Sequence, residues 1–273
     1  MRATRVPKKA HTYPFRVHIT GAARSGTTLM LALMLTCFDI DGGMARETRL
    51  WRTPVRGRRI VVTKQPADEK LALFLSRLDP KLHVIYMLRD PRDVIVSRHG
   101  TEPNRYWTNL RAWRQSVAAA SRYIGRPRLH IVRYEDLLND PDAVQQALSR
   151  AMPFLQMVQP FSTFHDVAEL KTAQWRAAMG SIRRVTGAES PSWHKHLPRL
   201  KGQMVRHGDL SDDLIRLGYE KDEQWLELLD DVSPDLAESR TPEREPLRRR
   251  FDHGWRDLLG ALTYAGQRLA VWP

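Results

Sequence analysis

The chain has 273 residues, of which 42% are hydrophobic and 27% charged, and this composition indicates a globular protein with a sizeable core. Its single cysteine, Cys37, excludes an intrachain disulfide and a cysteine-based zinc cluster. The formal net charge of +13 favours a polyanionic partner, such as a nucleotide, a nucleic acid, an acidic substrate or a membrane surface. Because the excess comes mostly from arginine, codon bias would explain it equally well.

The sequence lacks an apolar stretch long enough to span a bilayer, and the basic residues 1–15 lack the apolar run of a signal peptide. We therefore expect a cytoplasmic protein without a membrane span. The length suits one main α/β domain better than two full domains.

Apolar runs rich in Val and Ile alternate with helical patterns along the chain. The runs predict buried strands at 15–20, 58–64, 82–88 and 128–134. The patterns between and after them predict helices at 28–38, 68–78, 91–99, 104–124 and 141–151. Such alternation is typical of a parallel sheet with helices on both faces, so we expect an α/β fold of three layers.

The C-terminal part differs in composition from the strand and helix repeat. Residues 211–230 predict two short helices that close the domain, and residues 232–250 are polar and contain prolines, as linkers do. Residues 250–270 predict one last amphipathic helix. We therefore expect one domain at 1–230 and a C-terminal linker and helical extension at 231–273.

The segment GAARSGTT, at 21–28, follows the first predicted strand and opens the first predicted helix. This context is that of the phosphate-binding loop G-x-x-x-x-G-K-[ST], but Thr27 stands where the lysine belongs. Backbone N–H groups and the helix N-terminus would hold an anion there, with Arg24 as the replacement cation. The other loop residues expected to supply amides and hydroxyls are Ser25, Gly26, Thr27 and Thr28.

Two of the later predicted strands end on a cation, Lys64 and Arg89. A magnesium-dependent nucleotide enzyme would instead place an acidic residue at the end of a second buried strand. The carboxyl ends of parallel strands meet at the edge where open α/β sheets bind ligands, and the arginine fork suits a phosphate. This pattern favours a metal-free anion site; the plain alternative for Arg89 is a surface salt bridge to Asp90 or Asp93.

Four segments resemble, in family order, the sulfotransferases that use 3'-phosphoadenosine 5'-phosphosulfate (PAPS). GAARSGTTLM is similar to their 5'-phosphosulfate loop, and YMLRDPRDVIVS to their 3'-phosphate segment. VRYEDLLNDP is similar to the strand and turn near the adenine. The fourth match has two parts, SPSWHKHL and LIRLGYEKDEQW, which resemble the basic loop and the closing segment. The resemblance covers about residues 15–228.

This resemblance implies a P-loop fold, PAPS as the sulfuryl donor, 3',5'-adenosine bisphosphate (PAP) as the product, no metal and an acceptor hydroxyl or amine. It assigns Arg24 and the loop amides to the 5'-phosphosulfate, and Arg89 and Ser97, taken to lie in the following helix, to the 3'-phosphate. It also assigns Tyr134 to the adenine and Lys195 to the basic loop near the 3'-phosphate. No nucleic-acid motif is present in the sequence.

Sulfuryl transfer needs cations on the leaving side and a base on the acceptor side. By the resemblance, Lys64 contacts the bridging or sulfuryl oxygens. The histidine base of many cytosolic sulfotransferases is missing, since Gln65 follows Lys64. GGMARETRLWR instead resembles the Glu-Thr-Arg segment of tyrosylprotein sulfotransferases, which implies Glu47 as the base, with Arg49 binding the acceptor or holding the carboxylate.

Simpler interpretations stay open for several residues. Glu47 could be a loop carboxylate paired with Arg46 or Arg49. Weaker candidates for the base are Asp39, Asp41, His99 and His18, and the last is more typical of a structural residue within a strand. Aromatic residues expected to pack in the core are Trp193 and, on one long helical pattern, Tyr106, Trp107 and Trp113.

Two other functions compete with sulfuryl transfer. An ATP-dependent kinase would need the loop lysine and a metal carboxylate, and Thr27 and the cationic strand ends disfavour both. An inactive protein of the same fold would keep the binding loop without the chemistry. Peptide tyrosine, carbohydrate, lipid and small alcohols all remain open as acceptors, as does the oligomeric state.

Overall fold

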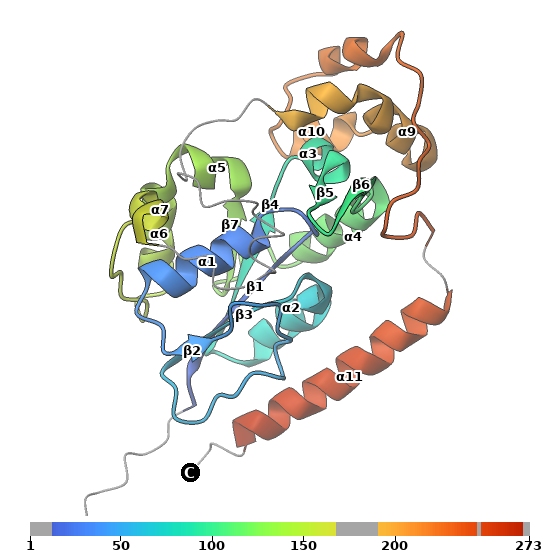
Figure 1. Cartoon of the computed structure of the whole chain (residues 1–273). Helices are drawn as coiled ribbons and strands as arrows, with labels where there is room; N and C mark the ends of the chain where they lie inside the picture. Colours follow the sequence, from blue (N-terminus) through green and yellow to red (C-terminus); the bar gives the residue numbers. More distant parts are fainter. Residues whose placement is uncertain (1–12, 168–190, 245–246, 270–273) are drawn as a thin grey trace, which may run out of the picture.

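A computed structural model describes residues 13–167, 191–244 and 247–269 (Figure 1). Its centre is a five-stranded sheet in the order β2-β3-β1-β4-β7, in which every pair is parallel. The strands are β1 (Phe15–Gly21), β2 (Gly42–Gly43), β3 (Ile60–Lys64), β4 (Leu82–Leu88) and β7 (Leu129–Arg133). Four of them confirm the predicted strands, and the short β2, made of two glycines, was not predicted.

Helices cover both faces of this sheet, as the strand and helix alternation predicts. They are α1 (Thr27–Cys37), α2 (Glu69–Leu78), α3 (Pro91–Val96), α4 (Leu110–Ser121), α5 (Tyr134–Asn139), α6 (Pro141–Ala151) and α7 (Phe164–Val167). A 3₁₀ turn, η1 (Pro66–Asp68), precedes α2, and η2 (Phe161–Thr163) precedes α7. The α/β class with a parallel sheet and helices is therefore confirmed.

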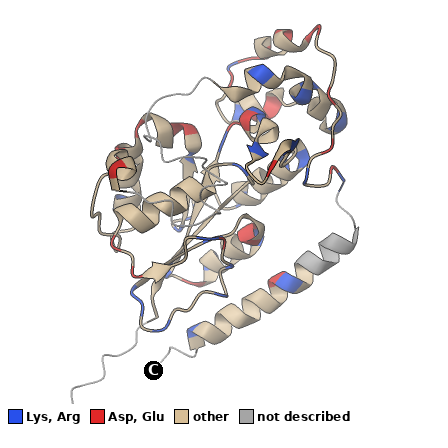
Figure 2. Ribbon diagram, viewed as in Figure 1, with Lys and Arg blue, Asp and Glu red and all other residues tan. Residues whose placement is uncertain are grey.

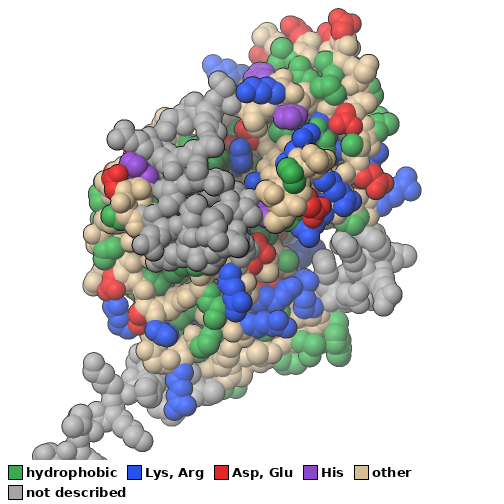
Figure 3. All heavy atoms as spheres, in the orientation of Figure 1, with side chains coloured by type: hydrophobic (Ala, Val, Ile, Leu, Met, Phe, Trp, Pro, Cys, Tyr) green, Lys and Arg blue, Asp and Glu red, His purple; other side chains and the backbone are tan. Residues whose placement is uncertain are grey.

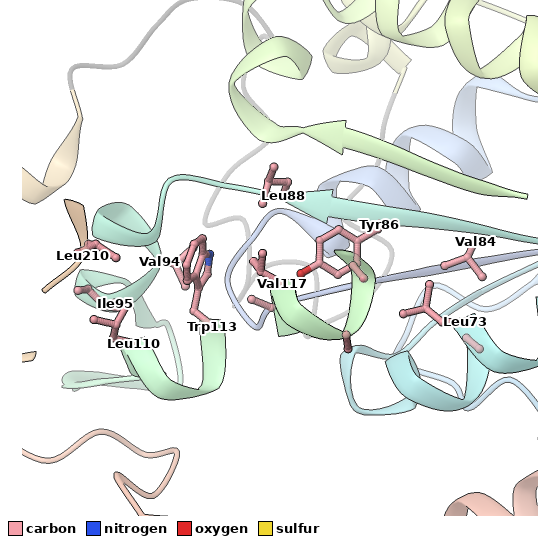
Figure 4. Packing of buried hydrophobic residues seen from close by; sticks show 14 of the residues in the cluster. Leu73, Val84, Tyr86, Leu88, Val94, Ile95, Leu110, Trp113, Val117 and Leu210 are labelled. Atoms are coloured by element: carbon pink, nitrogen blue, oxygen red, sulfur yellow. The ribbon is translucent and has the colours of Figure 1, made fainter. Parts of the chain in front are cut away.

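The core divides along β4, whose side chains alternate between the two faces of the sheet. Val84 and Tyr86 belong to the cluster under α2 and α4, while Ile85 belongs to the cluster under α1. Figure 4 shows the first cluster, where Trp113 and Val117 of α4 lie against β4 and its continuation. This packing fixes the carboxyl ends of β1, β3 and β4 relative to one another.

Two helix boundaries between β4 and β7 differ from the prediction. The helix predicted at 91–99 ends at Val96, and that predicted at 104–124 begins only at Leu110. Between them lies an antiparallel hairpin of β5 (Arg98–His99) and β6 (Glu102–Tyr106). Asn109 caps α4 by accepting a hydrogen bond from the Ala112 N–H, which sets the true start of that helix.

The C-terminal elements begin with two that pack on α3 and α4, and the later ones contact α9 or bond to α4 through Arg114 and Asp213. They are η3 (Ser192–His196), α9 (Leu197–His207), α10 (Ser211–Arg216) and η4 (Gln224–Leu229). The last two confirm the pair of short helices predicted at 211–230.

The interpretation of residues 232–250 as a linker is wrong for their described part up to 244. The Asp235 N–H donates to the Pro198 carbonyl at 2.8 Å, and the Arg240 N–H donates to the Tyr106 carbonyl at 2.8 Å. Ser239 is only 2% exposed. Backbone groups of this segment and the buried Ser239 side chain bond to the domain, which composition alone does not reveal.

The predicted last helix is present as α11 (Leu247–Leu269), which lies along the domain beside α2 in Figure 1. Tyr264 anchors it, since this residue is 2% exposed and its hydroxyl donates to Asp79 Oδ2 at 2.6 Å. Gln267 donates to the Trp51 carbonyl at 2.7 Å. Among the described residues, no helix has both the length and the apolarity needed to cross a membrane.

Candidate functional site

The loop between β1 and α1 makes a tight turn that side chains would block. Gly21 and Gly26 have φ values of 139° and 92°, in the region that favours glycine. A Cβ on Gly26 would collide with the ring of Tyr134, so α5 closes over the loop. Ser25 is buried and donates to the Ala22 carbonyl at 2.6 Å. The geometry is that of a preformed turn at the N-terminus of an 11-residue helix, where anions bind.

Lys64, at the end of β3, joins this loop to the segment that carries Glu47. Its Nζ donates to Glu47 Oε1 at 2.7 Å and to Thr28 Oγ1 at 3.0 Å. The Thr48 N–H also donates to the Lys64 carbonyl at 2.9 Å, which holds the segment beside the strand end. Burial lowers the pKa of Lys64, against the opposing effect of Glu47. The lysine therefore contacts both the loop and the predicted base.

Arg49 points to a different carboxylate from the one considered in the sequence. Its Nη1 lies 2.5 Å from Asp68 Oδ1, and the Leu50 N–H donates to Asp68 Oδ2 at 3.0 Å. Burial raises the pKa of Asp68 to about 6, although the Leu50 N–H and Arg49 act in the other direction. The carboxylate of Glu47 bonds to Lys64, and Arg49, the partner considered for it in the sequence, bonds to Asp68.

Arg24, Arg89 and Ser97 come together although they lie on three segments. Arg24, with a left-handed φ of 75°, donates from Nε to Ser97 Oγ at 2.9 Å. Arg89 Nη1 donates to the Arg24 carbonyl at 3.1 Å, and its guanidinium lies 4.3 Å from the centre of the Tyr134 ring. Burial, and next the charge of Arg89, lower the pKa of Arg24. Ser97 follows α3 as its C-terminal cap, so its predicted position inside a helix is wrong.

Arg89 has donor capacity that the described residues do not use. Its Nε is buried and has no hydrogen-bond partner among them. Its Nη2 is 3.8 Å from Asp93 Oδ2, which is too long for a hydrogen bond. An unused buried N–H next to a second arginine is what an anion-binding position requires.

The basic segment predicted near the 3'-phosphate lies beside α3. Ser192 Oγ and the Trp193 N–H both donate to Asp93 Oδ1, at 2.8 Å and 3.1 Å, and Asp93 faces Arg89. Trp193 is 3% exposed, which confirms it as a packing residue. Lys195 is exposed on η3 and forms no hydrogen bond with Arg24 or Arg89 in the described part of the chain.

The weaker candidates for the base fall into three places. His18 is fully buried on β1 with Nδ1 2.8 Å from Thr63 Oγ1, and burial lowers its pKa to about 3, which confirms a structural role. Asp39 and Asp41 pair with Arg59. His99 lies on the β5–β6 hairpin, where burial and then the charge of Arg24 lower its pKa.

The aromatic residues predicted on one helical pattern divide between two elements. Tyr106 is on β6 and Trp113 on α4, and both are buried, as expected for core packing. Trp107, between them, is half-buried and contacts His99, with ring centroids 4.4 Å apart and ring planes inclined by 31°. A helical period cannot describe this segment because β6 and α4 have different geometries.

The site as a whole carries more positive than negative charge. Arg24, Lys64 and Arg89 converge on the loop, and the carboxylates paired with them are Glu47 and Asp93. Within residues 13–167, 191–244 and 247–269, no three His, Cys, Asp or Glu side chains lie close enough to hold a metal ion. The donor set therefore fits a phosphorylated anion, bound by N–H groups and cations.

The parallel sheet, together with the loop between β1 and α1 at its carboxyl edge, defines an α/β protein with a loop of the phosphate-binding type. The model of the family described as "Sulfotransferase family" matches residues 37–153, less than half of the chain. The matched range contains Glu47, Lys64, Arg89, Ser97 and Tyr134, and it begins after the loop. No curated protein matches the chain.

Solved structures that are similar to the chain include two sulfotransferase domains, each 17% identical to it. The domain from the curacin biosynthetic pathway has a TM-score of 0.37 and covers 52% of this chain and 75% of its own. The domain from the Synechococcus PCC 7002 olefin synthase has a TM-score of 0.36, with 54% and 75% covered. Retinol dehydratase with androsterone and inactive cofactor PAP has 17% identity, a TM-score of 0.32, and coverage of 64% and 66%.

Proposed function

We propose that this protein is a sulfotransferase that moves the sulfuryl group of PAPS to an acceptor hydroxyl or amine. The observation that carries the proposal is the position of Lys64, whose buried Nζ contacts both Thr28 of the phosphate-type loop and the carboxylate of Glu47. A cation between the anion loop and a carboxylate base is the arrangement that in-line group transfer needs.

The residues present fit the donor. The loop amides and the hydroxyls of Thr27 and Thr28 would bind the 5'-phosphosulfate at the start of α1. Arg89 and Ser97 would bind the 3'-phosphate, with Arg24 linking the two anion positions through its bond to Ser97. Tyr134 would lie next to the adenine, and the exposed Lys195 would extend the charge around the 3'-phosphate.

Bound PAPS supplies an activated sulfur that an acceptor oxygen or nitrogen attacks as the bond to the bridging phosphate oxygen breaks. Glu47 takes the acceptor proton in this proposal. Proton uptake neutralises the carboxylate that Lys64 pairs with, which frees the ammonium to stabilise the charge on the departing phosphate oxygen. Glu47 therefore acts on the acceptor, and Lys64 acts on the leaving phosphate.

Arg49 would help to position the acceptor from beside Glu47, held there by Asp68. The Glu-Thr-Arg segment supports a catalytic likeness to the tyrosylprotein enzymes, whereas the acceptor is set by residues that the base does not determine. Phenolic, alcoholic, carbohydrate and amine acceptors are all compatible with a carboxylate base.

Incubation with radiolabelled PAPS and a panel of peptides, phenols, sugars, lipids and amines tests the proposal. We expect label transfer to one class in the presence of a metal chelator, and loss of that transfer in Lys64→Met. Absence of transfer to every class, together with phosphoryl transfer from ATP and magnesium, would instead identify a kinase.

A further inference from the structure

The outward face of α11 has the opposite polarity from that of an ordinary surface helix. Five residues at helical spacing are exposed by 48% to 72%, and we call them the α11 stripe: Trp255, Leu258, Leu259, Leu262 and Leu269. At 100° per residue they cover about 100° of the helix circumference. A solvent-facing helix normally places polar residues on that side.

The opposite side of α11 is already used by the domain. Tyr264, diametrically opposed to the stripe, is buried and bonded to Asp79, and Gly260 lies against the Trp51 ring. The helix therefore cannot rotate to bury the stripe without losing Tyr264. Figure 2 shows that charged residues are few on its described part, where the sequence has Arg256, Asp257 and Arg268.

Exposed arginines lie on the segment of the domain against which α11 packs. Arg52 follows Trp51, whose carbonyl accepts a hydrogen bond from α11, and Arg56 is on the same segment between β2 and β3. Both are exposed and form no side-chain hydrogen bond or ion pair with the described residues. In Figure 3, Lys and Arg side chains gather over this segment, and hydrophobic side chains of α11 lie beside them on the same face.

We propose that the α11 stripe and the neighbouring arginines bind an anionic membrane surface. An apolar helix face with tryptophan and leucine enters the headgroup boundary, and adjacent arginines bind acidic headgroups. A second copy of the chain fits less well as the occupant. Pairing two stripes would bring two sets of Arg52 and Arg56 together on molecules that each carry a formal net charge of +13.

This binding is separate from the sulfuryl transfer proposed above, because the stripe shares no residue with the loop edge, by which we mean the β1–α1 loop with Lys64 and Arg89. The anionic surface would hold the protein with the segment of Glu47 nearby, since that residue and Arg52 lie on the same connection between β2 and β3. PAP affinity reports on the loop edge alone, so failure of one proposal leaves the other measurable.

Co-sedimentation of the full chain with vesicles tests the proposal. We expect binding to vesicles of equal parts phosphatidylcholine and phosphatidylglycerol, and much weaker binding to phosphatidylcholine alone. Leu258→Ser with Leu262→Ser should lower the partition coefficient at least about tenfold, since two leucines lose their burial in lipid. Arg52→Gln with Arg56→Gln should lower it about fivefold per charge and flatten its dependence on salt.

The matched control is Leu228→Ser with Leu236→Ser, two leucines exposed by 45% and 47% outside α11, which should leave vesicle binding unchanged. Equal thermal midpoints of all variants show that the fold is kept. Absence of binding to the anionic vesicles, or binding that the α11 leucine variants do not change, overturns the proposal. A dimer that those same variants dissociate also overturns it, and makes a second copy the occupant.

Discussion

Arg89 and Arg92 are three residues apart at the same edge of the sheet, and their surroundings are opposite. Arg92 donates to Asp90 Oδ2 at 2.8 Å and to Glu220 Oε1 at 2.5 Å, and its guanidinium lies 4.3 Å from the Trp193 ring centre. Burial alone would lower the pKa of Arg92, but its bonds to Asp90 and Glu220 raise it.

Arg89, in contrast, is not fully paired. Its Nε has no partner among the described residues, and the carboxylate nearest to it, Asp93, is shared with Ser192 and Trp193. A fully paired arginine holds elements together, whereas an arginine with an unused buried donor is available for a ligand. Substitutions at the two positions should therefore separate stability from binding.

The largest expected effect is on stability, in Arg92→Met. The change leaves the buried Asp90 and the half-buried Glu220 without their cation, which should lower the free energy of unfolding by about 3–5 kcal/mol. Urea denaturation measures it. The matched variant Arg89→Met should lose less than about 1 kcal/mol, and equal losses in the two variants would contradict the distinction.

The next effect is on catalysis, in Glu47→Gln. Removing the proton acceptor should slow label transfer from PAPS by ~10² or more, because general base catalysis contributes that much. PAP affinity should stay within about twofold, since the fold and the cations are kept. Turnover close to that of the wild type would move the base to another residue, of which His99 on the hairpin is the nearest candidate.

A smaller effect is expected on donor affinity, in Arg89→Gln. The loss of a charge-assisted fork should weaken PAP binding about 10- to 100-fold, which corresponds to about 1.4–3 kcal/mol. Arg89→Lys keeps the charge without the planar fork and should give an intermediate affinity. Isothermal titration calorimetry measures all three proteins, and unchanged affinity in Arg89→Gln would remove this arginine from the donor site.

The smallest effect is a pH dependence that comes from Lys64. Because burial lowers the pKa of this lysine, its ammonium should lose its proton below the ordinary value, and its attraction for an anion is lost as pH rises through that lowered pKa. PAP affinity should therefore fall between neutral pH and about pH 10. In Lys64→Met the affinity should be weaker at neutral pH and flatter over this range. The same decline in the variant would assign it to another group.

The sequence was sufficient to predict four of the five strands of the sheet and to single out residues that meet at its edge. The strands and the loop follow local rules of hydrophobic pattern and turn chemistry, and these also put Lys64 and Arg89 at one edge. The sequence likewise singled out Glu47, and the structure places its carboxylate on Lys64.

What the sequence did not predict depends on contacts between distant residues. The pairing of Arg49 with Asp68 joins a loop to η1, and no spacing rule connects them. The β5–β6 hairpin was missed because aromatic residues at 106–113 mimic a helical period that continues into α4. The contact between Arg24 and Ser97 depends on where α3 ends, a boundary that local pattern sets poorly.

The proposed function requires that the edge formed by the β1–α1 loop, Lys64 and Arg89 binds an adenosine bisphosphate without metal, and a calorimetric titration measures this binding. The full chain is titrated with PAP in the presence of a chelator, and separately with ATP and magnesium. We predict tight binding of PAP that Arg89→Gln weakens, and weak binding of ATP. Preference for ATP with magnesium, or binding of PAP that neither Arg89→Gln nor Lys64→Met alters, would rule out the proposed donor site.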